Sequence, residues 1–243
     1  MKFVCVIPAR FASSRLPGKP LKMIDGRTMI ERVYQKAKSV QQISQVIVAT
    51  EDVRIMNYCK SKDINSILTS IEHKNGSERV SEVSREIESD YIITLQGDEP
   101  LIEIENIQKS IDFVAKNKDI EILSLMKKFT LPVDIVNNTT PKVVLDSNSN
   151  ALYISRSPIP FPMDNLDFEY YKPLGIYLFK KFLIDQYLDM KVGYLEKTEQ
   201  LELLRFIENG YKIRFLETES SSIAVDTYKD LLRVERIFEE KND

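Results

Sequence analysis

Short apolar runs alternate with amphipathic segments through the first half of the chain. The runs lie at residues 3–7, 45–50, 66–69 and 91–95, and the intervening segments lie at residues 28–40, 52–62 and 78–87. In residues 28–40, the apolar positions recur at spacings of three and four, as on a helix that buries one face. The runs are continuous in apolar residues, which is typical of strands covered on both faces. This alternation predicts an α/β fold with a parallel sheet.

The pattern changes after a further amphipathic segment at residues 103–117. Two apolar runs, at 142–146 and 151–156, flank the turn-rich letters SNSN, and prolines punctuate the residues that follow. We expect an antiparallel excursion there. The alternation resumes with a run at 173–179, a helical pattern at 197–210, a run at 211–218 and a helical pattern at 227–240. We therefore predict a single domain over residues 1–243, with a doubly wound, mostly parallel sheet and an excursion at about 142–180.

The composition is that of an ordinary globular protein. The chain has 243 residues, of which 43% are apolar and 29% are charged, and its net charge of −3 disfavours a nucleic-acid partner. Any anion site must therefore be local. No apolar run approaches the roughly 20 residues of a membrane span, so no membrane partner is expected. Cys5 and Cys59 lie in apolar and helical patterns, which predicts reduced, inert thiols and a cytoplasmic protein.

One loop collects cations. The letters PARFASSRLPGKPL, residues 8–21, follow the first apolar run and contain Arg10, Arg15 and Lys19 but no acid. In doubly wound sheets, ligands bind beyond the carboxyl ends of strands, where this loop begins. Arginine forks and a lysine point charge suit a nucleoside triphosphate. The alternative is a solvated basic loop. The loop lacks the glycines of a P-loop or a dinucleotide fingerprint, which disfavours an oxidoreductase.

Two aspartates are candidate metal ligands. Asp98 lies in QGDEP, directly after the run at 91–95, and Asp226 ends the apolar letters before the last helical pattern. Nucleotidyl transfer needs a divalent cation, and Mg²⁺ prefers carboxylate and phosphate oxygens. The alternatives are an acidic turn at Asp98 and a helix N-cap at Asp226. His73 is the chain's one histidine, and no neighbouring groups in the sequence support it as a general base.

The motifs IPARFASSRLPGKPL, LQGDEP, KVVLD, ALYISRSPIP, LGIY and VDT occur in this order along nearly the whole chain. In these motifs the chain resembles the 3-deoxy-manno-octulosonate (Kdo) cytidylyltransferases. The resemblance implies a Rossmann-like nucleotidyltransferase fold, and CTP and a 3-deoxy-ulosonic acid, with Kdo as the leading sugar, as substrates. It implies CMP-sugar and pyrophosphate as products, for lipopolysaccharide or capsule synthesis. It also implies a homodimer formed through the excursion.

The resemblance assigns roles to individual residues. It implies a catalytic set of Arg10, Arg15, Lys19 and Asp98. The implied nucleotide-binding residues are Ala9, Arg10, Ser14, Lys19, Gly76, Ser77 and Arg79. The implied sugar-binding residues are Gln96, Arg156, Tyr177 and Glu202. The implied ligands of Mg²⁺ are Asp98 and Asp226.

Three positions depart from the family pattern. The resemblance implies that the letters EHKNGSERV, residues 72–80, form the nucleotide segment that reads cytosine, and Asn75, Gly76 and Ser77 stand there where the family usually has Ser-Gly-Thr. Pro173 stands where the family commonly has His, and Leu203 stands where it commonly has Gln. The last two replace hydrogen-bonding side chains with apolar ones, so they bear on the sugar more than on the reaction. A cytidylyltransferase for another sugar acid, such as 8-amino-Kdo or a nonulosonate, is therefore an open alternative. So is a non-catalytic nucleotide-binding or assembly protein.

Overall fold

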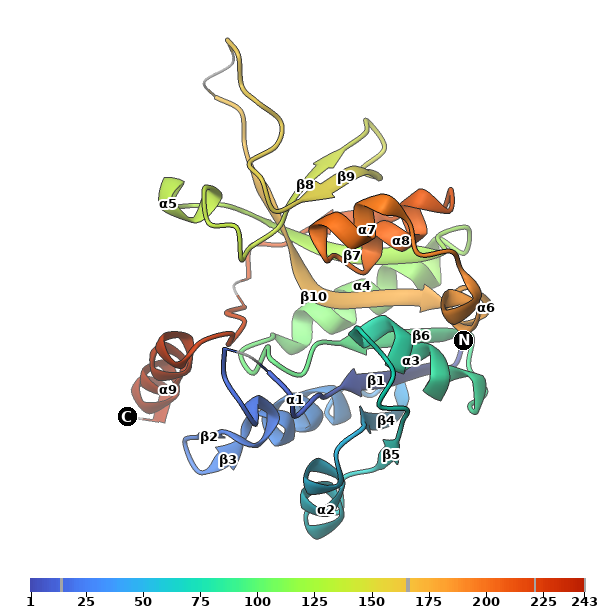
Figure 1. Cartoon of the computed structure of the whole chain (residues 1–243), viewed down its shortest axis with the longest axis vertical. Coiled ribbons are helices and arrows are strands. Elements are labelled where there is room, and N and C mark those ends of the chain that lie inside the picture. Colours follow the sequence, from blue (N-terminus) through green and yellow to red (C-terminus); the bar gives the residue numbers. More distant parts are fainter. Residues whose placement is uncertain (14, 165–166, 221, 243) are drawn as a thin grey trace.

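A mixed sheet runs through the centre of the molecule in the computed structural model, which describes residues 1–13, 15–164, 167–220 and 222–242 (Figure 1). Its strands are β1 (Phe3–Pro8), β4 (Ile43–Thr50), β5 (Ser66–Leu68), β6 (Tyr91–Leu95), β7 (Ile122–Lys128), β8 (Lys142–Leu145), β9 (Ala151–Ser155), β10 (Tyr171–Lys180) and β11 (Arg214–Glu217). Among the described residues, the main path has the order β11-β7-β10-β6-β1-β4-β5. All neighbours on this path are parallel except β10, which is antiparallel to both β6 and β7.

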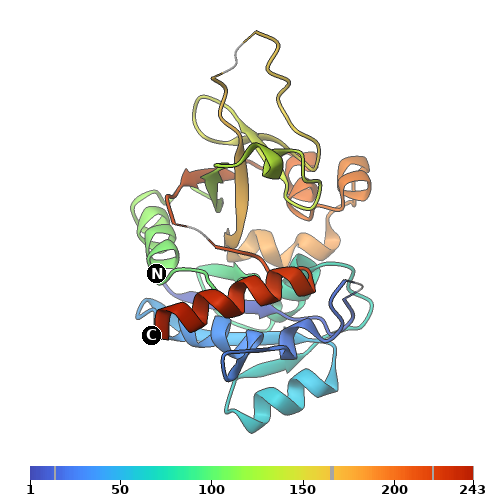
Figure 2. The same cartoon turned by 90° about the vertical axis from the view of Figure 1, so that its left-hand side faces the viewer.

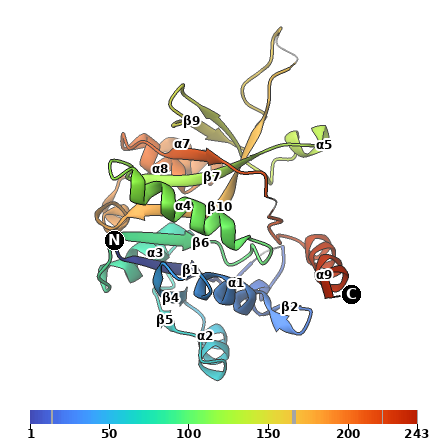
Figure 3. The same cartoon turned by 180° about the vertical axis from the view of Figure 1, so that it is seen from behind.

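Helices cover both faces of the sheet. They are α1 (Met29–Lys38), α2 (Val53–Ser61), α3 (Gly76–Arg85), α4 (Ile104–Lys116), α5 (Pro132–Ile135), α6 (Lys181–Asp185), α7 (Tyr194–Glu199), α8 (Leu203–Glu208) and α9 (Tyr228–Asn242). One core packs α1, α2 and α4 on one face, and Figure 3 shows α1 and α4 in front of the sheet. The other core packs α3, α6 and α8 on the opposite face. Since successive residues of β1 alternate between the two cores, this strand is apolar throughout.

The end of the chain returns to its beginning. Helix α9 packs against the short hairpin of β2 (Met23–Ile24) and β3 (Arg27–Thr28), and Figure 2 shows it crossing in front of the amino-terminal half. The residues before α9 thereby meet the loop that follows β1. Strands β8 and β9 form a hairpin beside the main path, from which β10 runs back into the sheet. No helix in the described part of the chain is long and apolar enough to cross a membrane.

Two elements differ from the sequence-based expectation. Strand β7 was not predicted, yet it lies inside the sheet between β11 and β10. The helix expected over residues 197–210 is broken into α7 and α8 at Gln200, which adopts a positive φ of 54°. The break is caused by tertiary contacts, because the Glu199 carboxylate binds strand β9 and the Glu202 carboxylate binds α3 and the turn after β6. Glu202 is therefore the N-cap residue of α8 and lies outside its helical turns.

Candidate active site

The cation loop lines a cavity of about 750 Å³ at the carboxyl ends of β1 and β6. The lining residues come from this loop, from the start of α3, from the QGDEP turn and from the segment before α9: Pro8, Ala9, Arg10, Ala12, Ser13, Arg15, Lys19, Pro20, Gly76, Gln96, Gly97, Asp98 and Asp226. The predicted nucleotide residues Ala9, Arg10, Lys19 and Gly76 are thus brought together. The predicted Ser14 lies outside the described residues.

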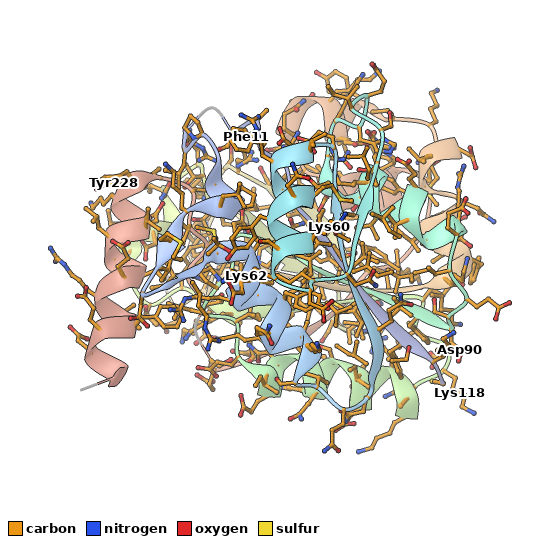
Figure 4. The ribbon with its side chains drawn as sticks, turned by 90° about the horizontal axis from the view of Figure 1, so that it is seen from below. Phe11, Lys60, Lys62, Asp90, Lys118 and Tyr228 are labelled. Carbon is orange, nitrogen blue, oxygen red and sulfur yellow. The ribbon has the colours of Figure 1, made fainter. Side chains whose placement is uncertain are left out.

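Contacts from neighbouring elements fix the shape of the cation loop. The backbone N–H of Phe11 donates to Glu51 Oε1 at 3.2 Å, and the Arg54 guanidinium lies 3.3 Å from the centre of the Phe11 ring. Figure 4 shows Phe11 beside the first turn of α2. Gly18 has a φ of +68°, and a Cβ there would lie 3.1 Å from the Phe11 ring. The loop is therefore folded around Phe11, which leaves its cationic side chains to face the cavity.

Lys19 joins the two predicted metal ligands. Its Nζ lies 2.6 Å from Asp98 Oδ2 and 3.2 Å from Asp226 Oδ1, and Arg15 Nη2 lies 3.2 Å from the same Asp226 oxygen. Burial lowers the pKa of Lys19, but the two carboxylates raise it by more, so the pKa lies above its usual value. The blue loop and the red segment before α9 meet at this point in Figure 1. A cationic side chain therefore lies between two acids that are far apart in sequence.

The segment before α9 presents Asp226 without using it as a helix cap. Thr227 Oγ1 accepts from the N–H of Asp230 at 3.3 Å, and Asp230 Oδ2 accepts from the N–H of Thr227 at 2.9 Å, as in a reciprocal capping arrangement. The N–H of Val225 donates to the Asp98 carbonyl at 2.8 Å, which ties the two acidic segments together. The N-cap alternative for Asp226 is therefore wrong, since Thr227 fills that role.

The chemistry of this group of side chains fits Mg²⁺. Mg²⁺ in nucleotide sites is bound by one or two carboxylates, with phosphate and water oxygens completing an octahedral shell. Asp98 and Asp226 supply two such carboxylates, at side-chain exposures of 25% and 30%. The described residues hold no group of three or more His, Cys, Asp or Glu side chains that converge as a metal site. The remaining ligands would come from the nucleotide and from water.

A second cavity, of about 260 Å³, adjoins the first. Its lining residues are Arg10, Asn75, Gly76, Gln96, Pro141, Ile154, Pro173, Tyr177, Gln200, Leu201, Glu202 and Leu203. The predicted sugar residues Gln96, Tyr177 and Glu202 lie here, as do all three departures from the family pattern. Arg10, Gly76 and Gln96 line both cavities, so the two spaces meet at these residues.

Glu202 connects the walls of the second cavity. Its Oε1 accepts from Gln96 Nε2 at 2.9 Å, and its Oε2 accepts from the N–H of Ser77 at 2.9 Å. Burial raises the pKa of Glu202, and burial likewise raises the pKa of Tyr177 well above its usual value. Tyr177 therefore presents a neutral hydroxyl at neutral pH.

Four of the residues considered from the sequence lie outside the two cavities. Arg79 is 1% exposed and binds Glu51 at 2.9 Å and the Thr69 hydroxyl. Arg156 donates to the carbonyl of Glu199 at 2.7 Å, and Ser77 is fully buried. His73 binds the Glu82 carboxylate. None of these four side chains is among the described residues that line either cavity, so the roles predicted for Arg79, Arg156 and Ser77 remain predictions.

Comparison with known proteins decides the family. A family model for cytidylyltransferases matches residues 4–213. The 3-deoxy-manno-octulosonate cytidylyltransferase of Fusobacterium nucleatum subsp. nucleatum is 46% identical over 243 residues, which cover 100% of this chain and 99% of that protein. That of Koribacter versatilis is 41% identical, over 100% of this chain and 92% of that protein. The chain belongs to the 3-deoxy-manno-octulosonate cytidylyltransferase family.

Solved structures agree with membership of this cytidylyltransferase family. A CMP:2-keto-3-deoxy-manno-octonic acid synthetase complexed with CTP aligns with a TM-score of 0.93 at 34% identity, over 99% of this chain and 100% of that one. A 4-diphosphocytidyl-2C-methyl-D-erythritol synthase from Anaerococcus prevotii shares the fold, with a TM-score of 0.66 at 18% identity, over 98% and 96% of the two chains. The chain is a nucleotidyltransferase, and the predicted doubly wound fold is confirmed.

Residues that support the site of this cytidylyltransferase were not predicted from the sequence. Glu51 binds both the cation loop and Arg79, and Arg205 binds the two buried carboxylates of Glu78 and Glu196. A signal for Glu51 was present, because it directly follows strand β4 at the ligand-binding edge of the sheet. Arg205 has a signal too, since it interrupts the apolar letters LL and F in a buried helix.

Proposed function

We propose that this chain transfers the cytidylyl group of CTP to a 3-deoxy-ulosonic acid, with Kdo as the leading sugar, and releases pyrophosphate. The observation that carries the proposal is the placement of Lys19 between Asp98 and Asp226 in a cavity that opens onto Gln96, Tyr177 and Glu202. This arrangement offers one site for a triphosphate and a neighbouring site for a polar sugar. The names of the relatives and the CTP complex of a similar structure support the same reaction.

The residues of the first cavity suit an in-line displacement at the α-phosphorus. The anomeric hydroxyl oxygen of the sugar attacks the α-phosphorus from the second cavity, and the bond from the α-phosphorus to the bridging oxygen of the leaving pyrophosphate breaks. Lys19, Arg10 and Arg15 hold the phosphate oxygens and offset the charge that builds up on them. We assign Lys19 to the α-phosphate, since it is the most enclosed of these cations, with a side-chain exposure of 15%.

We propose that Asp98 and Asp226 hold Mg²⁺ together with the phosphates. When bound, Mg²⁺ would neutralise negative charge on the leaving pyrophosphate. The Lys19 ammonium binds one oxygen of each carboxylate. When Mg²⁺ binds, the ammonium therefore has to move toward the nucleotide or share those oxygens with the metal.

The sugar is decided by the second cavity, where Pro173 and Leu203 stand in place of the hydrogen-bonding residues common in the family. The deciding experiment measures pyrophosphate release from the purified protein with CTP and Mg²⁺, with and without Kdo, and with ATP, GTP and UTP as controls. Release that needs both CTP and Kdo supports the proposal. CTP binding without turnover of Kdo, but with turnover of 8-amino-Kdo or a nonulosonate, reassigns the sugar. Binding with no turnover of any sugar supports a non-catalytic protein.

We also propose a homodimer. A cavity of about 640 Å³ beside the β8–β9 hairpin has a largely apolar lining that includes Leu145, Leu152, Ile159 and Phe168. Leu152 is 61% exposed, and Phe161 and Met163 nearby are exposed too. An apolar surface of this kind suits a second copy of the chain. Leu152→Glu should shift the molecular mass in light scattering from dimer to monomer, whereas Val53→Glu, an equally exposed position on α2, should not. A monomeric wild-type protein contradicts the proposal.

The reduced state of the two cysteines supports a location in the cytoplasm. Cys5 and Cys59 are free, buried thiols, and burial raises the pKa of Cys59 to about 11. Thiols of this kind are inert and are common in a reducing compartment. We therefore place the enzyme in the cytoplasm, where it would supply an activated sugar for lipopolysaccharide or capsule.

A further inference from the structure

Arg205, Glu78 and Glu196 form a buried ion cluster beside the start of α3, where Gly76 lines both cavities. Arg205 of α8 has a side-chain exposure of 3% and binds Glu78 Oε1 at 2.8 Å through Nη2. It also binds Glu196 through two bonds of 2.7 Å, and its guanidinium lies 4.1 Å from the centre of the Tyr187 ring. The cluster lines neither cavity within the described residues. Any effect of Arg205 on a ligand in either cavity therefore passes through other groups.

The two carboxylates of this cluster hold the backbone and the side chain just before α3. Glu78 Oε2 accepts from the N–H of Lys74 at 2.7 Å, and Glu196 Oε1 accepts from Asn75 Nδ2 at 3.3 Å. Asn75 in turn caps α3, because its Oδ1 accepts from the N–H of Glu78 at 2.9 Å. Lys74 and Asn75 are therefore held from the α8 side by groups that Arg205 orients.

Lys74 connects this cluster to the cation loop. Its carbonyl accepts from Arg10 Nη1 at 2.9 Å, while its N–H is held by Glu78. Arg10 is an exposed side chain of a loop, and within the described residues this is the hydrogen bond that fixes its guanidinium. A continuous path therefore runs from Arg205 through Glu78 and the backbone of Lys74 to Arg10, which lines both cavities.

We propose that Arg205 is a positioning residue for CTP: it holds Glu78, and through Lys74 it aims Arg10 at the nucleotide. The proposal rests on the proposed function in so far as CTP is the ligand. A guanidinium suits the role because its planar fork binds Glu78 and Glu196 at once, whereas a lysine is a point charge and cannot make these bonds together. The residue contacts no substrate itself.

The test uses Arg205→Lys, which keeps the buried charge and loses the fork. Its matched control is Arg32→Lys, since Arg32 is also enclosed, at 11% side-chain exposure, binds Asp25 at 3.0 Å and stacks 3.9 Å above Phe238. CTP affinity is measured by calorimetry with Mg²⁺, and the KM for CTP and kcat by pyrophosphate release. Because a small displacement of a binding group has a large effect, we expect Arg205→Lys to weaken CTP binding and raise the KM for CTP about tenfold. We expect Arg32→Lys to change either by less than about twofold.

A double-mutant cycle tests the path. In an Arg10→Met background, Arg205→Lys should cost less than about threefold in CTP affinity, because the group that it positions is already gone. Two independent, additive losses overturn the proposal, and so does an unchanged CTP affinity in Arg205→Lys with only a lower melting temperature. If Arg205→Lys does not fold, Glu78→Gln replaces it. The amide oxygen of the glutamine can still accept from the Lys74 N–H, while the negative charge that pairs with Arg205 is lost. The binding arm needs no sugar, so a wild-type protein that binds CTP and does not use Kdo contradicts the proposed reaction alone.

Discussion

Lys19→Met tests the chemistry of the first cavity most directly. The substitution keeps the length and much of the apolar stem of the side chain but removes the ammonium that lies 2.6 Å from Asp98 and 3.2 Å from Asp226. Two effects follow. Under the proposed mechanism the α-phosphate loses a preorganised cation, and the two carboxylates lose the positive charge that they share.

The size of each effect follows from the geometry. Removing one preorganised donor from a charge-stabilising site costs about 100- to 1,000-fold in kcat. The pKa of Lys19 is raised in the fold, so its stabilising contribution is fully present below its ordinary value of 10.5 and is lost as the pH rises through the folded pKa. At neutral pH the variant should therefore lose roughly 1.5–3 kcal/mol of unfolding free energy, the net contribution of a hydrogen bond to a charged group. Mg²⁺ should bind the nucleotide-free variant more tightly than the wild type, because the ammonium no longer competes for the carboxylates.

Three assays separate these effects. Pyrophosphate release gives kcat and the KM for CTP, urea unfolding gives stability, and calorimetry gives Mg²⁺ affinity without nucleotide. The control is Lys22→Met, the same chemical change three residues along, at a side chain that is not among the described residues lining the cavity. A fall in kcat well beyond the rise in KM supports a role at the α-phosphate. A raised KM with unchanged kcat would refute it, and weaker Mg²⁺ binding would refute the shared carboxylates.

Three further substitutions have defined outcomes. Asp98→Asn should abolish pyrophosphate release while leaving the melting temperature near that of the wild type, because it removes a charged metal ligand, and unchanged activity at saturating Mg²⁺ would contradict the assignment of Asp98. Gly175→Ala should lower the unfolding free energy by roughly 1–3 kcal/mol, because its Cβ would collide with the Glu99 carboxylate in the core, whereas Gly210→Ala, with no atom within 4 Å, should cost only the roughly 1–2 kcal/mol of a positive φ. For Glu78, burial raises the pKa, but Arg205 and the Lys74 N–H lower it by more, so the pKa in the folded protein lies below 4.5. The stabilising contribution of Glu78 is therefore present above pH 4.5 and is lost as the pH falls through the folded pKa. Urea unfolding should therefore show a stability gap between wild type and Glu78→Gln that is full at neutral pH and closes in acid, and a gap independent of pH would contradict this.

The elements that the sequence predicted are those with local causes. The run of apolar residues in β1 follows from burial on both faces, and the spacing in α1 follows from one buried face. Strand order has no such local cause. β7 carries a polar residue in its middle, Ser124, and this side chain is buried only because its hydroxyl donates to the Ile176 carbonyl of β10 at 3.1 Å. The pattern therefore gave no continuous apolar run to recognise there.

The site shows the same division. The cation loop was recognised because its three cations lie close together in the chain, between residues 10 and 19, and the loop directly follows the first strand. The contact of Asp98 and Asp226 through Lys19 joins residues 128 positions apart, and only the fold brings them together. Burial of a side chain also depends on residues distant in sequence. Two adjacent charged residues, such as Glu78 and Arg79, are typical of an exposed surface, yet both are buried here and bind Arg205 and Glu51 on other elements.

The break at Gln200 shows how tertiary contacts override a local pattern. Residues 197–210 contain no Gly or Pro before position 210, and Leu201, Leu204 and Ile207 recur at spacings of three, so the sequence predicts one helix. In a continuous helix, Glu199 and Glu202 would lie three residues apart on one face and would reach the same neighbour. In this fold their partners lie on different elements, because Glu199 binds Ser155 at 2.6 Å on β9 and Glu202 binds Ser77 and Gln96 at 2.9 Å. One residue with a positive φ turns the second carboxylate toward the cavities, and the same turn starts the short helix that carries Arg205. One wall of the second cavity and the support of the segment before α3 therefore depend on one irregular residue, which helical periodicity does not predict.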